Sequence, residues 1–147
     1  MKNAAGQTII EFALILLLVV SLLFGITEFG RAWFYSNALE NGVRAGARYA
    51  AALPNGTSFE TSVKSYTFAQ ITSAIPRGDM TTDYINISAY GSTPPYSPRT
   101  TFDDLSAGDA VTVIAHYDFT VLTGSIIPFF SGTKVLTKKA TMRYEHD

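Results

Sequence analysis

Residues 6–26 read GQTIIEFALILLLVVSLLFGI, and this stretch decides how the rest of the chain can fold. From Phe12 onward it contains no charged residue and a single hydroxyl. Together with Ile9 and Ile10 it approaches the ~20 apolar residues that a helix needs to cross the core of a bilayer. We therefore expect a transmembrane span over about residues 9–27.

One acidic residue, Glu11, lies just inside the apolar run. A carboxylate at the centre of a membrane helix costs about 2.5–3.5 kcal/mol on insertion scales, and the cost falls toward the end of the span. An ionisable residue kept within a span is a candidate functional residue. The residues alone also allow a second interpretation, in which the positive N-terminal end of the helix stabilises the carboxylate by about 0.3–1 kcal/mol.

The apolar run differs from a cleaved secretory signal in its length and in the residues after it. It is about as long as the upper limit of ~15 apolar residues for such signals, and no small-x-small cleavage pattern occurs at Thr27-Glu28-Phe29. Lys2 favours a cytoplasmic N-terminus, although Arg31 lies beyond the span on the other side, beside Glu28.

The composition limits the classes of function. The chain has 147 residues, which leaves roughly a hundred after the span for one small core. Its net charge of −1 gives no reason to expect nucleic acid as a partner, and the absence of cysteine excludes disulfides and Cys-based zinc sites. Neither His116 nor His146 has a metal-ligand spacing, and we interpret Asp103, Asp104 and Asp109 as a solvated turn. We expect no enzymatic activity, no metal and no cofactor.

The helix is expected to continue well beyond the membrane. No proline occurs before Pro54, and apolar residues recur at spacings of three to five after the span. This pattern predicts one helix from about Ile9 to Ala52, straight or bent at a glycine, and roughly 65 Å long at 1.5 Å per residue. Such a helix is longer than a bilayer is thick, so its second half must lie in water and pack against other parts of the chain.

The helical glycines have two interpretations, close packing against the chain's own globular part or close approach of neighbouring helices. These glycines are Gly25, Gly30, Gly42 and Gly46.

The remaining sequence predicts an α+β domain over residues 54–147, packed on the long helix. Apolar spacing indicates a second helix from about Ser58 to Ala74, which ends before Pro76. Alternating apolar and polar residues predict three strands of a small antiparallel sheet, at Asp83–Tyr90, Asp109–Leu122 and Lys134–Glu145. The apolar connection 124–132 is either a loop over the core or an exposed patch that meets a partner subunit.

The N-terminal part of the chain resembles the TadE-like family of minor pilins (pseudopilins) of tight-adherence (Tad/Flp) pili. Its members open with a short basic leader, a glycine, and a glutamate five residues later. A long apolar helix comes next, with an E-x-G-R-A-like and an R-x-G-A-R-Y-A-like stretch. The matching residues here are Gly6, Glu11, Glu28, Gly30, Arg31, Ala32, Arg44, Gly46, Ala47, Arg48 and Tyr49.

Two features favour the minor class. Major Flp pilins usually carry Glu-Tyr where this chain has Glu11-Phe12, and they are little more than the helix. The segment Ala140–Glu145 also looks like the last strand of the TadE-like family.

The resemblance implies a pilin-like fold and a processing step. A prepilin peptidase would cleave the Gly6–Gln7 bond, which would remove a cytoplasmic leader, residues 1–6, and leave a mature helix, 7–53. Glu11, followed by Phe12, would then neutralise the new N-terminus of an adjacent subunit.

The resemblance also implies partners and a location. The partners would be the peptidase, other pilin subunits, the pilus assembly platform, and the membrane before assembly. The chain would wait as a single-pass protein of the inner (cytoplasmic) membrane with its C-terminal domain outside the cytoplasm, and would then join or prime a pilus used in surface adhesion. The alternative is a permanently inserted single-span protein whose outer domain binds a ligand or partner.

Overall fold

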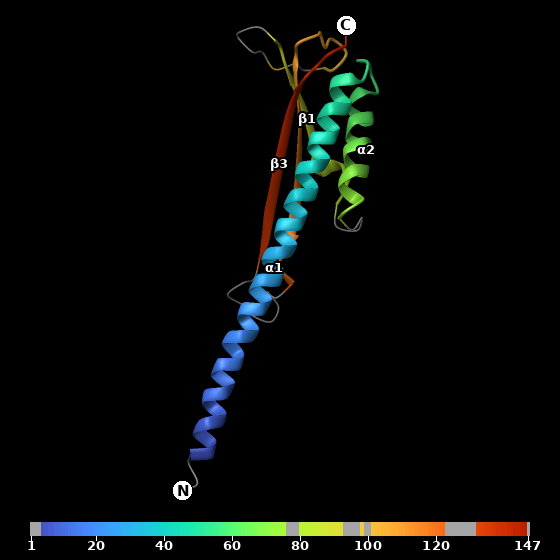
Figure 1. Cartoon of the computed structure of the whole chain (residues 1–147). Helices are drawn as coiled ribbons and strands as arrows, with labels where there is room; N and C mark the ends of the chain where they lie inside the picture. Colours follow the sequence, from blue (N-terminus) through green and yellow to red (C-terminus); the bar gives the residue numbers. More distant parts are fainter. Residues whose placement is uncertain (1–3, 76–79, 93–97, 99–100, 123–131, 147) are drawn as a thin grey trace.

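The computed structural model describes residues 4–75, 80–92, 98, 101–122 and 132–146. The elements come in the order α1 (Ala4–Ala52), α2 (Phe59–Thr72), the short 3₁₀ helix η2 (Thr82–Tyr84), β1 (Ile85–Tyr90), β2 (Ala110–Thr120) and β3 (Thr133–Arg143) (Figure 1). The predicted α+β fold, with a long N-terminal helix, a second helix and a small antiparallel sheet, is confirmed.

The N-terminal half of α1 extends alone from the rest of the molecule (Figure 1). The helix starts at Ala4, earlier than the sequence pattern indicates, and continues without a break past Gly25 and Gly30. Its apolar window is long and apolar enough to cross a membrane, and none of that window is buried within the chain. The length and composition of α1 are the observations that support a transmembrane span here.

Both helices cover one face of the sheet. The strands lie in the order β1-β2-β3, and both pairs are antiparallel. α1 packs on β2 and β3, while α2 packs on α1 and β1. The predicted alternation in β2 is confirmed, because its inward side chains are all buried: Val111, Val113, Ala115, Tyr117 and Phe119.

The inward face of β3 is only half-buried, because β3 is an edge strand beside the helix. Lys138 lies on this face between Leu136 and Ala140, and its Nζ donates a hydrogen bond to Glu40 Oε2 at 3.3 Å. This pair was not predicted from the sequence, although period-two alternation alone places Lys138 on the helix side.

Two glycines allow α1 and α2 to approach closely. An added Cβ at Gly42 would lie 2.2 Å from Ile71 Cγ1, and one at Gly46 would lie 2.0 Å from Thr67 Oγ1. Both glycines and Thr67 are buried. Packing within the chain therefore explains Gly42 and Gly46, whereas a Cβ at Gly25 or Gly30 would meet none of the described residues outside its own stretch of helix within 4 Å.

A hydrogen-bonded cluster connects the C-terminal end of the chain to the end of α1. The backbone N–H of Glu145 donates to the carbonyl of Ala51 at 3.0 Å, and the N–H of Tyr144 donates to the carbonyl of Asp109 at 2.7 Å. The Asp109 carboxylate accepts from the N–H groups of Ser92 and Ser106. Asp109 is only 1% exposed, so our interpretation of it as part of a solvated turn was wrong.

The sequence did not show that Asp109 satisfies backbone donors, which is the usual requirement for a buried carboxylate. Asp103 and Asp104 are exposed, as expected. The connection predicted at 124–132 lies outside the described residues except for Gly132.

Replacing Gly46 with Ala should lower the free energy of unfolding by about 1–3 kcal/mol, because the new methyl group overlaps Thr67 Oγ1 in a buried contact. Gly30→Ala is the matched control and should be neutral or stabilising by up to ~1 kcal/mol, because the added Cβ meets no described residue outside its own stretch of helix. Denaturant titration of the full chain in detergent measures both. Equal effects of the two substitutions would contradict the packing role of Gly46.

Candidate assembly and processing site

The predicted processing and assembly residues lie on the first turns of α1. Gly6, Gln7, Glu11 and Phe12 are all exposed on the isolated half of the helix. The amide Nε2 of Gln7 donates a hydrogen bond to Glu11 Oε1 at 3.1 Å, across one helical turn. The helix therefore brings the residue after the expected cleavage point next to the carboxylate.

Within the described part of the chain, no lysine or arginine pairs with Glu11. The ion pairs of that part lie higher on α1, on α2, and between α1 and β3. Among the described residues, the side-chain partner of Glu11 is the uncharged amide of Gln7.

Glu28 and Arg31 lie where the domain first meets the helix. Their side chains form an ion pair at 2.7 Å, and Arg31 Nη2 donates to the carbonyl of Thr120 at the end of β2 at 3.3 Å. The guanidinium lies 4.8 Å from the centroid of the Phe119 ring, a cation–π distance. These contacts fix the lower end of the sheet to α1.

Aromatic rings strengthen the same junction. Tyr35 lies one helical turn above Arg31 and packs edge-on against Tyr117 and Phe119, at centroid distances of 5.2 and 5.8 Å. Edge-to-face pairs of this kind contribute about 0.5–1.5 kcal/mol each beyond their buried area. The E-x-G-R-A-like stretch thus joins the helix to the sheet.

The second motif stretch serves mainly the contact between α1 and α2. Gly46 abuts Thr67, and Tyr49 stacks on Tyr66 with ring centroids 4.4 Å apart. Arg44 forms an ion pair with Glu40, the residue that also accepts from Lys138. Arg48 is exposed and takes part in none of these contacts. The two motif stretches are therefore largely structural, and they lie far along α1 from Glu11.

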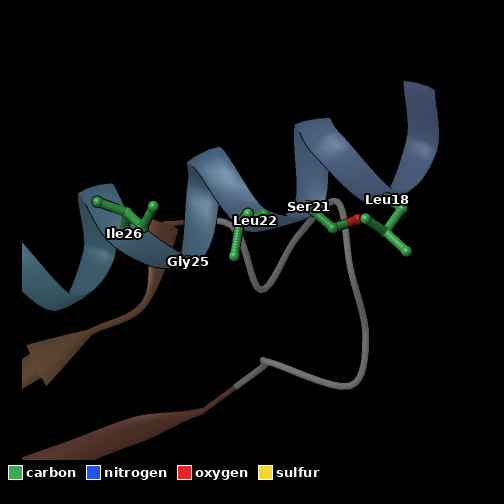
Figure 2. A pocket seen from close by; sticks show the side chains of 5 residues that line it. All are labelled: Leu18, Ser21, Leu22, Gly25 and Ile26. Atoms are coloured by element: carbon green, nitrogen blue, oxygen red, sulfur yellow. The ribbon is translucent and has the colours of Figure 1, made fainter. Parts of the chain in front are cut away.

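A shallow apolar pocket of about 460 Å³ lies on the span itself (Figure 2). Ser21 supplies the one polar side chain among the described residues that line it, and its hydroxyl donates to the carbonyl of Leu17 at 2.7 Å. Such a surface suits lipid tails or a neighbouring helix. The described residues that line the pocket are Leu18, Ser21, Leu22, Gly25 and Ile26.

Among the described residues, no group of three or more His, Asp and Glu side chains could hold a metal ion.

Comparison with known families identifies the N-terminal helix. The family model described as "TadE-like protein" matches residues 6–48, a range that begins at Gly6 and includes Glu11 and both motif stretches up to Arg48. This match confirms the resemblance, and α2 and the sheet lie outside it. No curated protein and no solved structure matches the chain.

Replacing Arg31 with Ala should destabilise the junction by about 1–2 kcal/mol, because an ion pair, a hydrogen bond and a ring contact are lost together. Arg48→Ala is the matched control and should change stability by less than about 0.5 kcal/mol, as is usual for an exposed site. Amide hydrogen exchange near Thr120 should accelerate only in the Arg31 variant. Unchanged exchange there would show that Arg31 does not hold the end of β2.

Proposed function

We propose that this Tad pilus-associated protein, whose residues 6–48 match the TadE-like family, is a minor pilin that is stored in the membrane and assembled after processing. The observation that carries the proposal is Glu11, a carboxylate on an exposed apolar helix with no cation to pair with in the described part of the chain. The proposed role is structural and involves no enzymatic activity.

The proposed processing step is hydrolysis of the Gly6–Gln7 peptide bond by a prepilin peptidase, with residues 1–6 on the cytoplasmic side. Gly6 lies in the exposed first turns of α1, and among the described residues no atom outside its own stretch of helix lies within 4 Å of where a Cβ would be. The absence of a Cβ leaves the scissile backbone open to a close-fitting protease. Hydrolysis would leave an α-ammonium on Gln7.

The new ammonium and the Glu11 carboxylate can neutralise each other's charge. An unpaired charge in or beside hydrocarbon is costly, and pairing with an opposite charge lowers that cost. Gln7 is one helical turn from Glu11 in its own chain, so the pair can form while the subunit waits in lipid. In an assembled filament, Glu11 would instead pair with the N-terminus of an adjacent subunit and so set the register between subunits.

The architecture supports a division of labour between the two halves of the chain. The exposed apolar half of α1 can wait in the inner membrane and later enter a helical bundle of subunits. The described contacts of the α+β domain with α1 run from Arg31 to Ala51, on the upper half of the helix, and the domain would remain outside the cytoplasm, displayed on the pilus or priming it. In this proposal the partners are other pilin subunits and the assembly platform, and the pilus serves surface adhesion.

Gly6→Ala should slow or block processing, because a methyl group is added at the scissile bond. In cells with a prepilin peptidase, intact mass should show a native chain beginning at Gln7 and a variant that keeps residues 1–6. Gly25→Ala, a substitution at another helical glycine with no close neighbour among the described residues, should be processed normally. Full cleavage of the Gly6 variant would count against the assignment of this site.

Glu11→Ala should leave membrane insertion intact, because it makes the span more apolar, but it should impair assembly by removing the partner of the freed ammonium. Counting pili by electron microscopy and quantifying the chain in membranes separates the two effects. Glu60→Ala on α2 removes a carboxylate outside the span and should assemble normally. Wild-type piliation of the Glu11 variant would refute the proposed role.

A further inference from the structure

Large apolar side chains remain exposed above the span, at the level where the domain begins. On α1 they are Phe29, Trp33 and Phe34, with Phe29 69% and Trp33 62% exposed. The rings of Phe29 and Trp33 stack on each other at 6.2 Å, away from the core. Just beyond the end of β2, Leu122 is 64% exposed. The core of the domain does not explain these side chains.

The contacts of Arg31 show that the exposed aromatic residues of α1 and the residues at the end of β2 lie at the same level along the helix axis. Arg31 donates to the carbonyl of Thr120, which fixes the end of β2 beside the helix two residues before Leu122. Exposed Lys134 pairs across the sheet with Phe119, whose ring lies against Arg31. The lower end of the sheet therefore lies level with the exposed aromatic residues of α1.

These residues lie on more than one side of α1. Arg31 faces the sheet, and residues two positions away on an α-helix point roughly to the opposite side, at 100° per residue. Phe29 and Trp33 therefore point away from the domain, while Leu122 and Lys134 extend from the domain itself. A protein partner would occupy one side of the helix, whereas a membrane interface surrounds it.

We infer that Phe29, Trp33, Phe34, Leu122 and Lys134 form an interfacial rim that rests in the outer headgroup layer of the bilayer. The inference rests on the proposed storage in the membrane, and it adds a lipid contact by the domain. The rim continues directly from the exposed apolar window, since Trp33 lies about 10 Å above Ile26 along the helix axis. Aromatic rings and lysine side chains with apolar stems are typical of that layer.

The rim would also set the depth of the processing site. Phe29 and Glu11 are about 27 Å apart along the uninterrupted helix, close to the ~30 Å thickness of the hydrocarbon core. With Phe29 held at the outer interface, Glu11 and the Gly6–Gln7 bond lie at the inner one. The domain would therefore limit how deeply α1 enters the bilayer, so that the cleavage site lies at the cytoplasmic face.

Depth-dependent fluorescence quenching of the full chain in phosphatidylcholine–phosphatidylglycerol vesicles tests the rim. Trp33 is the single tryptophan of the chain, so the native protein already reports one position. A second variant, Trp33→Phe with Leu122→Trp, reports the domain side of the rim. The control, Trp33→Phe with Tyr90→Trp, places the probe at the far end of β1, which lies level with the far ends of β2 and β3.

The inference predicts that tryptophan at 33 and at 122 shows a blue-shifted emission in vesicles and loses intensity with quenchers placed near the lipid carbonyls. Tryptophan at 90 should keep the emission of a water-exposed ring and resist the same quenchers. Quenching at 33 without quenching at 122 would show that the domain stands off the bilayer, and it would overturn the inference.

Two further outcomes are also decisive. If lipid quenchers have no effect at 33, and a blue shift appears in detergent only as protein concentration rises, a second copy covers the surface and the rim is wrong. Failure of the chain to float with the vesicles would overturn the proposed membrane storage, and the rim with it. Flotation with unquenched probes overturns the rim alone.

Discussion

One uninterrupted helix has an apolar, exposed first half suited to lipid and a second half that packs against a domain in water. This difference between the two halves shapes the rest of the molecule. The first half of α1 exposes apolar side chains along nearly its whole surface, whereas its second half buries a stripe against α2 and the sheet. The boundary between the two regimes lies near Glu28 and Arg31, where the first polar contacts with the domain form. The domain can therefore stay in water while the helix below it lies in lipid or among other helices.

Contacts at three levels of α1 join its upper half to the domain. Arg31 holds the lower end of the sheet, the Glu40–Lys138 pair holds the middle, and the Ala51 carbonyl holds the C-terminal segment. Gly42 and Gly46 bring α2 close enough to complete the core. These contacts connect the apolar half of α1 to the domain through the continuous helix.

The elements of this fold were predictable from local patterns, but several contacts were not. Proline-free apolar spacing predicted α1, and an alternation interrupted only at Ile114 predicted β2, since both depend on one buried face. The burial of Asp109 and the Glu40–Lys138 pair depend on residues far apart in sequence, which periodicity does not connect. Glu11 was predictable because it interrupts an apolar run, whereas no local pattern places Leu122 at the level of the exposed aromatic residues of α1.

We propose that the Glu11 carboxylate in the span pairs with an amino terminus that cleavage releases. Intact-mass measurement of the native chain in two fractions, membranes and purified pili with their assembly platform, tests it most directly. The account predicts that the chain in the pilus or platform fraction begins at Gln7. A chain that keeps its first six residues and is absent from both pili and platform would contradict it.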